Sequence, residues 1–232
     1  MNGTRVALVA CVAALAWVVW FRPPVILDTH TTTRQRVIAW TLARVDDPIV
    51  ILGDSITEAS TLPRSLCGHP VVNAGIGGVS TESGMDSLLT QSLDGKRAVL
   101  VVVALGANDA AIPNSVERYR SNYRALLETL STVTPRLAIL AIPPPEAGLE
   151  EVKKTRLAVI DSYNAVLPEL AKEARATFIA LPAMPERHTL DGLHLNAAGY
   201  AVWDRAILQG IEAVLCKSSR SRPQNRLASG SE

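Results

Sequence analysis

Residues 49–57 read Ile-Val-Ile-Leu-Gly-Asp-Ser-Ile-Thr, a short apolar run followed at once by Gly-Asp-Ser. The apolar half predicts a buried strand, and the residues after it predict the start of a helix. In open α/β sheets the ligand crevice lies at the carboxyl ends of the strands, so this order delivers Ser55 to the place where sites form. A serine at a helix start is also a common N-cap, and this stretch alone leaves both roles open.

The rest of the chain alternates strand and helix patterns in the same way. Five apolar runs are predicted as buried strands: Ile49–Leu52, Val71–Asn73, Ala98–Leu105, Leu137–Ile142 and Thr177–Ala180. Helical patterns lie at residues 80–93, 115–133, 149–174 and 196–215. Pro168 is expected to kink or divide the third helix. Because near-continuous apolar runs are typical of a sheet covered on both faces, we predict an α/β fold, a three-layer α/β/α sandwich with a five-stranded parallel sheet.

Two further stretches place polar groups at predicted strand ends. Residues 71–80 read Val-Val-Asn-Ala-Gly-Ile-Gly-Gly-Val-Ser, and their glycines let backbone N–H groups approach a ligand closely. Residues 98–105 are followed by Gly106-Ala107-Asn108-Asp109, where the Asn108 amide can point into the crevice. A helix cap or an Asx-turn explains the same asparagine, so neither stretch is decisive alone.

A histidine with a nearby carboxylate precedes the last predicted helix, in the stretch Asp191-Gly192-Leu193-His194. A carboxylate on one ring nitrogen sets the tautomer of a histidine and stabilises its cation, which suits a general base. His188, which follows Pro185-Glu186-Arg187, is the competing candidate among the four histidines.

Together these stretches resemble the four sequence blocks of the SGNH hydrolases, also called GDSL-type hydrolases. The matching blocks are Gly53-Asp54-Ser55-Ile56, the glycine of Asn73–Gly78, Gly106-Ala107-Asn108-Asp109 and Asp191-Gly192-Leu193-His194, in the family's order across residues 47–215. The resemblance implies the flavodoxin-like SGNH hydrolase fold.

The resemblance also implies a role for each matching residue. Ser55 would be the nucleophile, His194 the base, and Asp191 the group that orients His194. The oxyanion hole would comprise the Ser55 N–H, the Gly78 N–H and the Asn108 side chain. Gly78 is preferred to Gly77 because the family glycine usually sits five residues after the asparagine that opens its block. Asp54 is expected to brace the turn.

The implied function is that of a serine hydrolase that cleaves carboxylic esters or thioesters through an acyl-enzyme, with no metal and no cofactor. The expected substrate is a small-molecule, lipid or glycan ester. A short to medium acyl chain is favoured by the apolar residues beside Asn108, which are Ala107, Ala110, Ala111, Ile112 and Pro113. One alternative is an acyltransferase or O-deacetylase that acts on envelope glycans or lipids. Another is a non-catalytic carbohydrate- or lipid-binding domain, against which the intact set of site residues speaks.

The composition of the chain limits the classes of partner that it is expected to bind. The chain has 232 residues, of which 48% are hydrophobic, enough for one α/β domain. A formal net charge of +1 and an aromatic content of 4% argue against a nucleic-acid partner. Cys11, Cys67 and Cys216 show no metal-binding spacing, and we interpret Cys11 as a membrane-buried thiol and the other two as ordinary core or surface thiols. A Cys67–Cys216 bridge is the alternative in an oxidising compartment.

The N-terminus is predicted to lie outside the fold. An unbroken apolar run covers Val6–Phe21 and is slightly shorter than the roughly 17–25 residues of a membrane span. We predict an N-terminal membrane anchor or signal segment at 1–24, a connector with a short amphipathic helix at 25–46, the hydrolase domain at 47–216 and a disordered tail at 217–232. The prediction is a membrane-anchored, exported domain that contacts the membrane through its N-terminal segment. A cleaved and secreted or a cytoplasm-facing domain is the alternative.

Overall fold

The computed structural model describes residues 29–111, 115–146, 148–149 and 157–219. The chain divides into two units, Met1–Thr33 and Arg34–Glu232, and of the first only Thr29–Thr33, the start of helix α2 (Thr29–Ala43), is described. The predicted anchor or signal segment at 1–24 lies outside the described residues, as do residues 220–232 of the predicted tail. Within the described ranges, no helix is both long and apolar enough to cross a membrane.

The second unit is built on a six-stranded sheet with the order β2-β3-β1-β4-β5-β6. Its strands are β1 (Ile49–Gly53), β2 (Ser65–Leu66), β3 (His69–Gly75), β4 (Leu100–Ala104), β5 (Leu137–Leu140) and β6 (Thr177–Ile179). The five predicted strands are present and mutually parallel. The predicted count of five is corrected by β2, which pairs antiparallel with β3 at the edge. A strand of two residues is too short to produce a periodic pattern in the sequence, so β2 could not be predicted.

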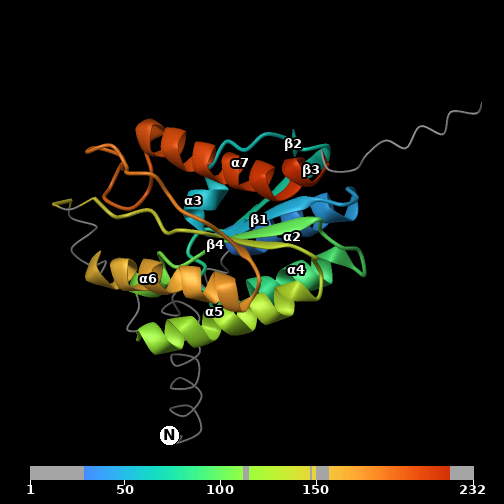
Figure 1. Ribbon diagram of the computed structural model, residues 1–232. Coiled ribbons are helices and arrows are strands. Elements are labelled where there is room, and N and C mark those ends of the chain that lie inside the picture. Colours follow the sequence, from blue (N-terminus) through green and yellow to red (C-terminus); the bar gives the residue numbers. More distant parts are fainter. Residues whose placement is uncertain (1–28, 112–114, 147, 150–156, 220–232) are drawn as a thin grey trace, which may run out of the picture. The chain divides into compact units, whose positions relative to one another are not determined.

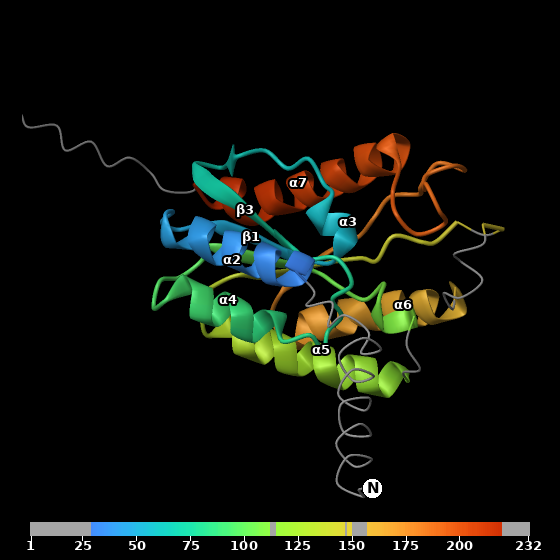
Figure 2. The ribbon, with the colours of Figure 1, turned by 180° about the vertical axis from the view of Figure 1, so that it is seen from behind.

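Helices cover both faces of this sheet, which confirms the three-layer α/β/α prediction (Figure 1). Helices α3 (Ser55–Glu58) and α7 (Ala197–Ser219) lie on one face. Helices α4 (Met85–Leu93), α5 (Val116–Ser131) and α6 (Leu157–Glu173) lie on the other, as the opposite view also shows (Figure 2). Strands β1 and β5 are buried along their whole length, as a sheet covered on both faces requires.

Two helices differ from their predicted form. Helix α4 begins at Met85 rather than near residue 80, because Gly84 takes a left-handed conformation (φ +69°) just before it. Helix α6 runs through Pro168 without being divided. Leu167 and Leu170, on either side of this proline, are buried in the core, and their packing outweighs the hydrogen bond that proline cannot donate.

The core extends further towards the N-terminus than the predicted domain start at residue 47. Helix α2 falls within the predicted connector at 25–46, yet its Ile38 and Leu42 are buried in the hydrophobic core. Val37 and Trp40, two other apolar residues of this helix, are exposed, so the clear division into an apolar and a polar face that was predicted for it is not present. The helix therefore packs as part of the domain from Arg34 onward.

We expect Leu42→Ala to lower the free energy of unfolding by about 2–5 kcal/mol, because the substitution leaves a cavity in the core. The matched control on the same helix is Val37→Ala, which should stay within about 0.5 kcal/mol of the native chain because Val37 faces solvent. Chemical denaturation of both variants measures the difference. Equal stabilities for the two would show that α2 is a connector after all.

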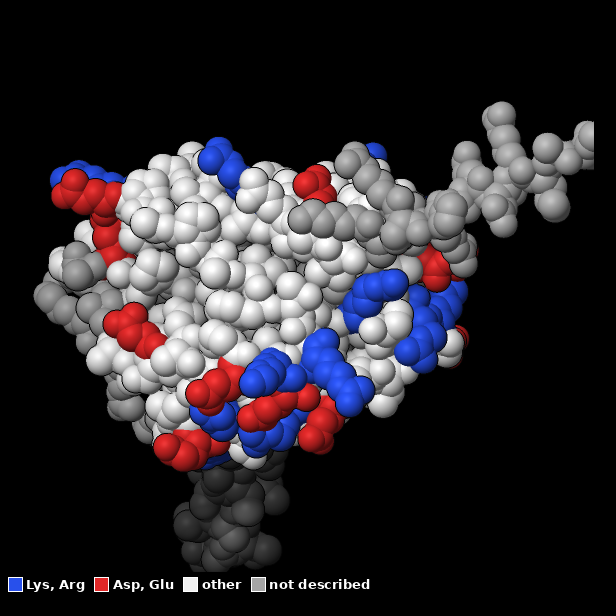
Figure 3. All heavy atoms as spheres, viewed as in Figure 1, with Lys and Arg blue, Asp and Glu red and all other residues white. Residues whose placement is uncertain are grey.

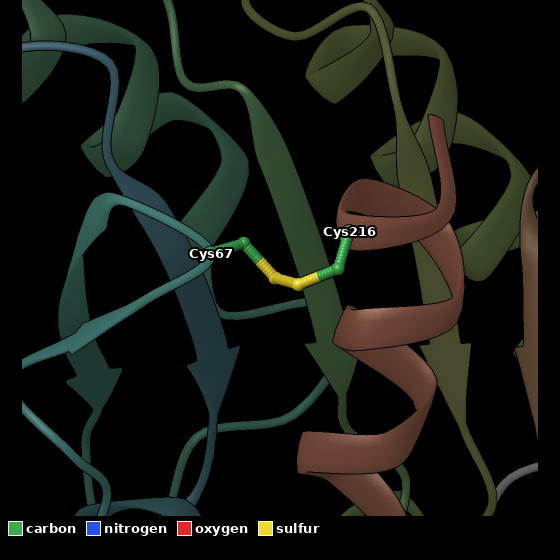
Figure 4. Close-up of a disulfide and its surroundings, with 2 residues drawn as sticks. All are labelled: Cys67 and Cys216. Carbon is green, nitrogen blue, oxygen red and sulfur yellow. A yellow bond between two sulfur atoms is a disulfide. The ribbon is translucent and has the colours of Figure 1, made fainter. Parts of the chain in front are cut away.

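A disulfide joins Cys67 and Cys216, residues separated by 149 positions (Figure 4). Cys67 lies in the turn between β2 and β3, and Cys216 lies near the C-terminal end of α7. The interpretation of these cysteines as ordinary thiols was wrong, and the bridge that was its alternative is present. The disulfide ties the edge of the sheet to the helix that follows the last strand.

Charged side chains on the face seen in Figure 3 gather over α5 and α6 as mixed pairs. Arg120 lies 2.6 Å from Glu169, and Arg124 lies 2.7 Å from Glu173. Much of the remaining surface in this view carries no charge. The cations of this region therefore face carboxylates of the neighbouring helix rather than forming a basic stripe.

The register of the strands brings the predicted site segments together. Gly53 at the end of β1 lies beside Gly75 on β3 and Ala104 on β4. Each strand therefore passes into its site loop at the same edge of the sheet. A Cβ at Gly75 would overlap the backbone of Glu58, so only glycine allows α3 to sit so close to the end of β3.

Candidate active site

Ser55 occupies the first position of α3, directly after β1. The preceding Asp54 is the N-cap, and its Oδ1 accepts a hydrogen bond from the Ile56 N–H at 2.9 Å. This cap turns the chain sharply from strand to helix and sets the serine at the sheet edge. The prediction that Asp54 braces the turn agrees with this geometry.

Ser55, His194 and Asp191 form a continuous line of hydrogen bonds. The Ser55 Oγ lies 3.0 Å from the His194 Nε2, and the His194 Nδ1 lies 2.6 Å from the Asp191 Oδ2. The other oxygen of Asp191 accepts hydrogen bonds from the N–H groups of Leu193 (3.0 Å) and His194 (2.8 Å). These contacts fix the carboxylate against the ring of His194.

Hydrogen bonds stabilise the ionised form of Asp191. Partial burial alone would raise the pKa of Asp191, but the hydrogen bonds from the His194 ring and from the backbone of Leu193 and His194 outweigh it and lower that pKa. An ionised carboxylate on Nδ1 leaves Nε2 free to take a proton. The arrangement can therefore accept the hydroxyl proton of Ser55.

The proposed oxyanion donors lie in the neighbouring loops. Gly78 has a φ of +80°, a conformation that favours glycine. In the described part of the chain, nothing accepts a hydrogen bond from the N–H of Ser55 or Gly78. The Asn108 Nδ2 donates to the Val79 carbonyl at 2.8 Å and carries a second hydrogen. The Gly77 N–H, the rival of Gly78, already donates to Glu58 Oε2 at 2.7 Å.

Three charged residues that the sequence analysis did not assign hold this loop in place. Glu58 accepts from Gly77 as above and pairs with Arg34, whose Nε lies 3.2 Å from its Oε1. Arg34 also donates to the Gly75 carbonyl at 2.8 Å. Asp109 accepts hydrogen bonds from both the N–H and the hydroxyl of Thr81. The sequence indicated these roles only through position, since Glu58 ends the short helix that begins at Ser55 and Asp109 directly follows Asn108.

Asp54, the residue before the serine, has a buried carboxyl group. Its burial raises the pKa of Asp54 to about 6, although the hydrogen bond from the Ile56 N–H acts in the opposite direction. Asp109 is also fully buried, and burial raises its pKa despite the hydrogen bonds from Thr81. Two carboxyls therefore lie behind the site loops with less tendency to ionise than at the surface.

His188 does not compete with His194 for Ser55. Its ring is buried, with Nδ1 at 2.8 Å from the Pro185 carbonyl and Nε2 at 2.8 Å from the Pro144 carbonyl. Both nitrogens therefore face backbone oxygens rather than a serine. In the described ranges, no cluster of three or more histidine, cysteine or acidic side chains could hold a metal ion.

A hydroxyl, an imidazole and a carboxylate in one line at the edge of a parallel sheet define a site of the kind found in serine hydrolases. The model of the GDSL-like Lipase/Acylhydrolase family matches residues 51–202. The chain belongs to this family and is an ester hydrolase. No curated protein matches the chain.

Solved structures share the fold. A putative platelet activating factor structure from Streptococcus pneumonia is 23% identical with a TM-score of 0.63, covering 90% of this chain and 99% of its own. The lipase/acylhydrolase from Enterococcus faecalis is 24% identical with a TM-score of 0.60, covering 72% and 96%. Axe2, an acetylxylan esterase from Geobacillus stearothermophilus, is 18% identical with a TM-score of 0.55, covering 71% and 94%. These likenesses support the SGNH hydrolase fold.

Proposed function

We propose that the chain is a serine hydrolase that cleaves carboxylic esters or thioesters through an acyl-enzyme. Ser55 is the nucleophile, His194 the general base, and Asp191 the carboxylate that orients His194. The hydrogen-bonded line from Ser55 through His194 to Asp191 carries this proposal, because it connects a hydroxyl to a base and the base to an ionised carboxylate.

The first half of the reaction acylates the serine. Ser55 Oγ attacks the acyl carbonyl carbon while its proton passes to His194 Nε2, and Asp191 stabilises the imidazolium that results. The oxyanion accepts hydrogen bonds from the N–H groups of Ser55 and Gly78 and from the Asn108 side chain. When the tetrahedral intermediate collapses, His194 returns the proton to the departing alcohol or thiol.

The second half releases the acyl group. A water molecule gives a proton to His194 Nε2 and attacks the acyl carbonyl, and the same three donors stabilise the second oxyanion. The intermediate expels the Ser55 oxygen, which recovers its proton from His194. The products are a carboxylic acid and the free enzyme, so the cycle needs no other reactant.

Hydrolysis of p-nitrophenyl acetate, butyrate and octanoate by the full-length chain tests the proposal. We expect nitrophenol release, together with covalent labelling of Ser55 by a fluorophosphonate probe, located by peptide mass spectrometry. The chain lengths also test the short to medium acyl group predicted for the site. Release of no nitrophenol from any of the three esters and no labelling at Ser55 would contradict the proposal.

An O-deacetylase that acts on a bulky carrier is the second candidate. The side chains of His194 and Asp191 are 44% and 37% exposed, so the site is open enough for a large alcohol group. The shared fold with an acetylxylan esterase makes acetylated xylan a suitable probe. Acetate release from acetylated xylan at a kcat/KM well above that for p-nitrophenyl acetate would favour this candidate, and the reverse would favour a small-molecule esterase.

Asn108→Ala is expected to slow turnover about 10²–10³-fold, because one of the three oxyanion donors is lost. Fluorophosphonate labelling should decline less than turnover. Asn122→Ala is the matched control, since Asn122 bonds Glu82 on the surface, and it should keep native kcat. Steady-state kinetics with p-nitrophenyl acetate checks both, and a native kcat for Asn108→Ala would remove this residue from the oxyanion hole.

The Cys67–Cys216 bridge supports an exported domain, because disulfides persist in oxidising compartments. On this proposal the N-terminal segment directs export, as an uncleaved anchor or as a cleaved signal. Maleimide labelling of acid-quenched cells tests the compartment. Cys67 and Cys216 should react only after reduction, and reaction without reductant would place the domain in a reducing compartment.

A further inference from the structure

Glu146, in the segment after β5, is hydrogen-bonded to the loop that carries Asp191 and His194. The Glu146 N–H donates to the Gly192 carbonyl at 2.8 Å. A single oxygen of this residue, Oε2, accepts hydrogen bonds from the His188 N–H (3.0 Å), the Thr189 N–H (3.0 Å) and the Thr189 hydroxyl (2.8 Å). Glu146 therefore contacts the loop on both sides of Asp191.

Thr189 connects Glu146 to the turn that carries Asp191 and His194. Its hydroxyl oxygen accepts from the Gly192 N–H at 3.1 Å while it donates to Glu146. Thr189 also forms a β-bridge with Leu195, and the Leu190 N–H donates to the His194 carbonyl at 2.7 Å. The turn from Thr189 to Leu195 is thus held by hydrogen bonds between its own two ends and by hydrogen bonds to Glu146.

His188 makes a second link between the same two segments. Its Nε2 lies at the Pro144 carbonyl, in the segment after β5, and its Nδ1 lies at the Pro185 carbonyl, at the start of the loop. The His188 ring is buried, unlike that of His194. Hydrogen bonds from Thr189 and from the backbone of His188 lower the pKa of Glu146 despite partial burial, so the carboxylate stays ionised at neutral pH.

The turn needs such a link because its tip is not held by burial. Leu190 is 74% exposed, and the side chains of Asp191 and His194 are also open to solvent. A side chain with few packing contacts changes position easily, and a displacement of about 1 Å at a reacting group can lower a rate about 100-fold. The position of this turn therefore depends on hydrogen bonds from a neighbouring segment rather than on packing in the core.

We propose that Glu146 and His188 form a clasp that holds the 188–195 turn, so that His194 stays in line with Ser55. Glu146 is a positioning residue, because it acts on the reaction through this turn. The inference rests on the proposed function, since it assigns the clasp to the reaction of Ser55 and His194. It also makes a prediction about backbone mobility that does not depend on turnover.

Two pairs of variants test the clasp in the full-length chain. Glu146→Ala removes the acceptor, whereas Glu146→Gln keeps an oxygen at the same place. Thr189→Val removes the hydroxyl, whereas Thr189→Ser keeps it. We expect Glu146→Ala and Thr189→Val to lower kcat for p-nitrophenyl acetate about tenfold or more with little change in KM, because the site is misplaced rather than blocked. Glu146→Gln and Thr189→Ser should recover most of the loss. The exposed Glu186→Ala, in the same loop, is the matched control and should keep native kcat.

Hydrogen exchange by mass spectrometry supplies the readout that is independent of activity. Amides of residues 188–196 should exchange at least tenfold faster in Glu146→Ala than in the native chain, with exchange in α5 unchanged. Native kcat and native exchange in both Glu146→Ala and Thr189→Val would overturn the clasp. Should Glu146→Ala fail to fold by circular dichroism, the Thr189 pair decides. A native chain without esterase activity would refute the proposed function, and faster exchange in the variants would still support the clasp.

Discussion

Replacing Ser55 with alanine is expected to remove fluorophosphonate labelling and to lower the hydrolysis of p-nitrophenyl acetate by about 10⁴-fold or more. His194→Ala should have a comparable effect, because a serine hydroxyl without its base is a weak nucleophile. The double variant should be no slower than either single variant, since the two residues act as a unit. Steady-state rates of the three proteins, each checked for folding by circular dichroism, give the comparison.

Asp191→Asn belongs to the same experiment and should be milder than His194→Ala. The asparagine changes the tautomer and orientation of the imidazole but leaves the base in place. His69→Ala, at the opposite end of β3 from the site loop, serves as a histidine control and should keep native turnover. A His194→Ala protein with native turnover would show that the Ser55–His194 contact has no part in the reaction.

Removal of the Cys67–Cys216 disulfide is expected to lower the free energy of unfolding by about 2–5 kcal/mol, because the bridge closes a long loop and restricts the unfolded chain. Catalysis should be spared, since Cys216 lies near the end of α7 that is remote from the site loops. Chemical denaturation of the Cys67→Ser, Cys216→Ser double variant measures the loss, and kcat of the same protein tests the second point.

Reduction provides the control for this experiment. Native protein in a strong thiol reductant should unfold at the same denaturant concentration as the double variant, and the variant should not respond to reductant. If the unfolding midpoint of the native chain stays the same on reduction, the bridge contributes nothing to stability.

The sequence predicted the parts of the molecule that depend on local pattern. Ser55, Asn108 and His194 each follow a recognisable apolar run or precede a helix, and parallel strands necessarily bring such loops to one edge. The same reasoning gave the five parallel strands and both layers of helices. The alternation of strands and helices along the chain was sufficient for this prediction, because right-handed crossovers allow few other arrangements of such elements.

Features that depend on contacts between residues far apart in the sequence could not be predicted from local patterns. Cys67 and Cys216 are 149 residues apart, and nothing in their local sequence indicates that β2–β3 and α7 meet. Glu58 and Glu146 are single acidic residues whose roles depend on backbone N–H groups from other segments. Helix α2 carries apolar residues that its sequence shows, but the tertiary fold decides that Ile38 and Leu42 enter the core while Trp40 stays exposed.

The Cys67–Cys216 bridge also changes what a single cut in the chain does. Gly78, Asn108, Asp191 and His194 lie between the two cysteines in sequence, whereas Ser55 lies before the first. Hydrolysis of any one peptide bond between residues 67 and 216 therefore leaves one covalent molecule in which Ser55 and His194 remain joined. A nicked chain would migrate as a single species on non-reducing electrophoresis and separate into two fragments only after reduction. For a protein exposed to proteases, one cleavage in this stretch would not release its nucleophile from its base.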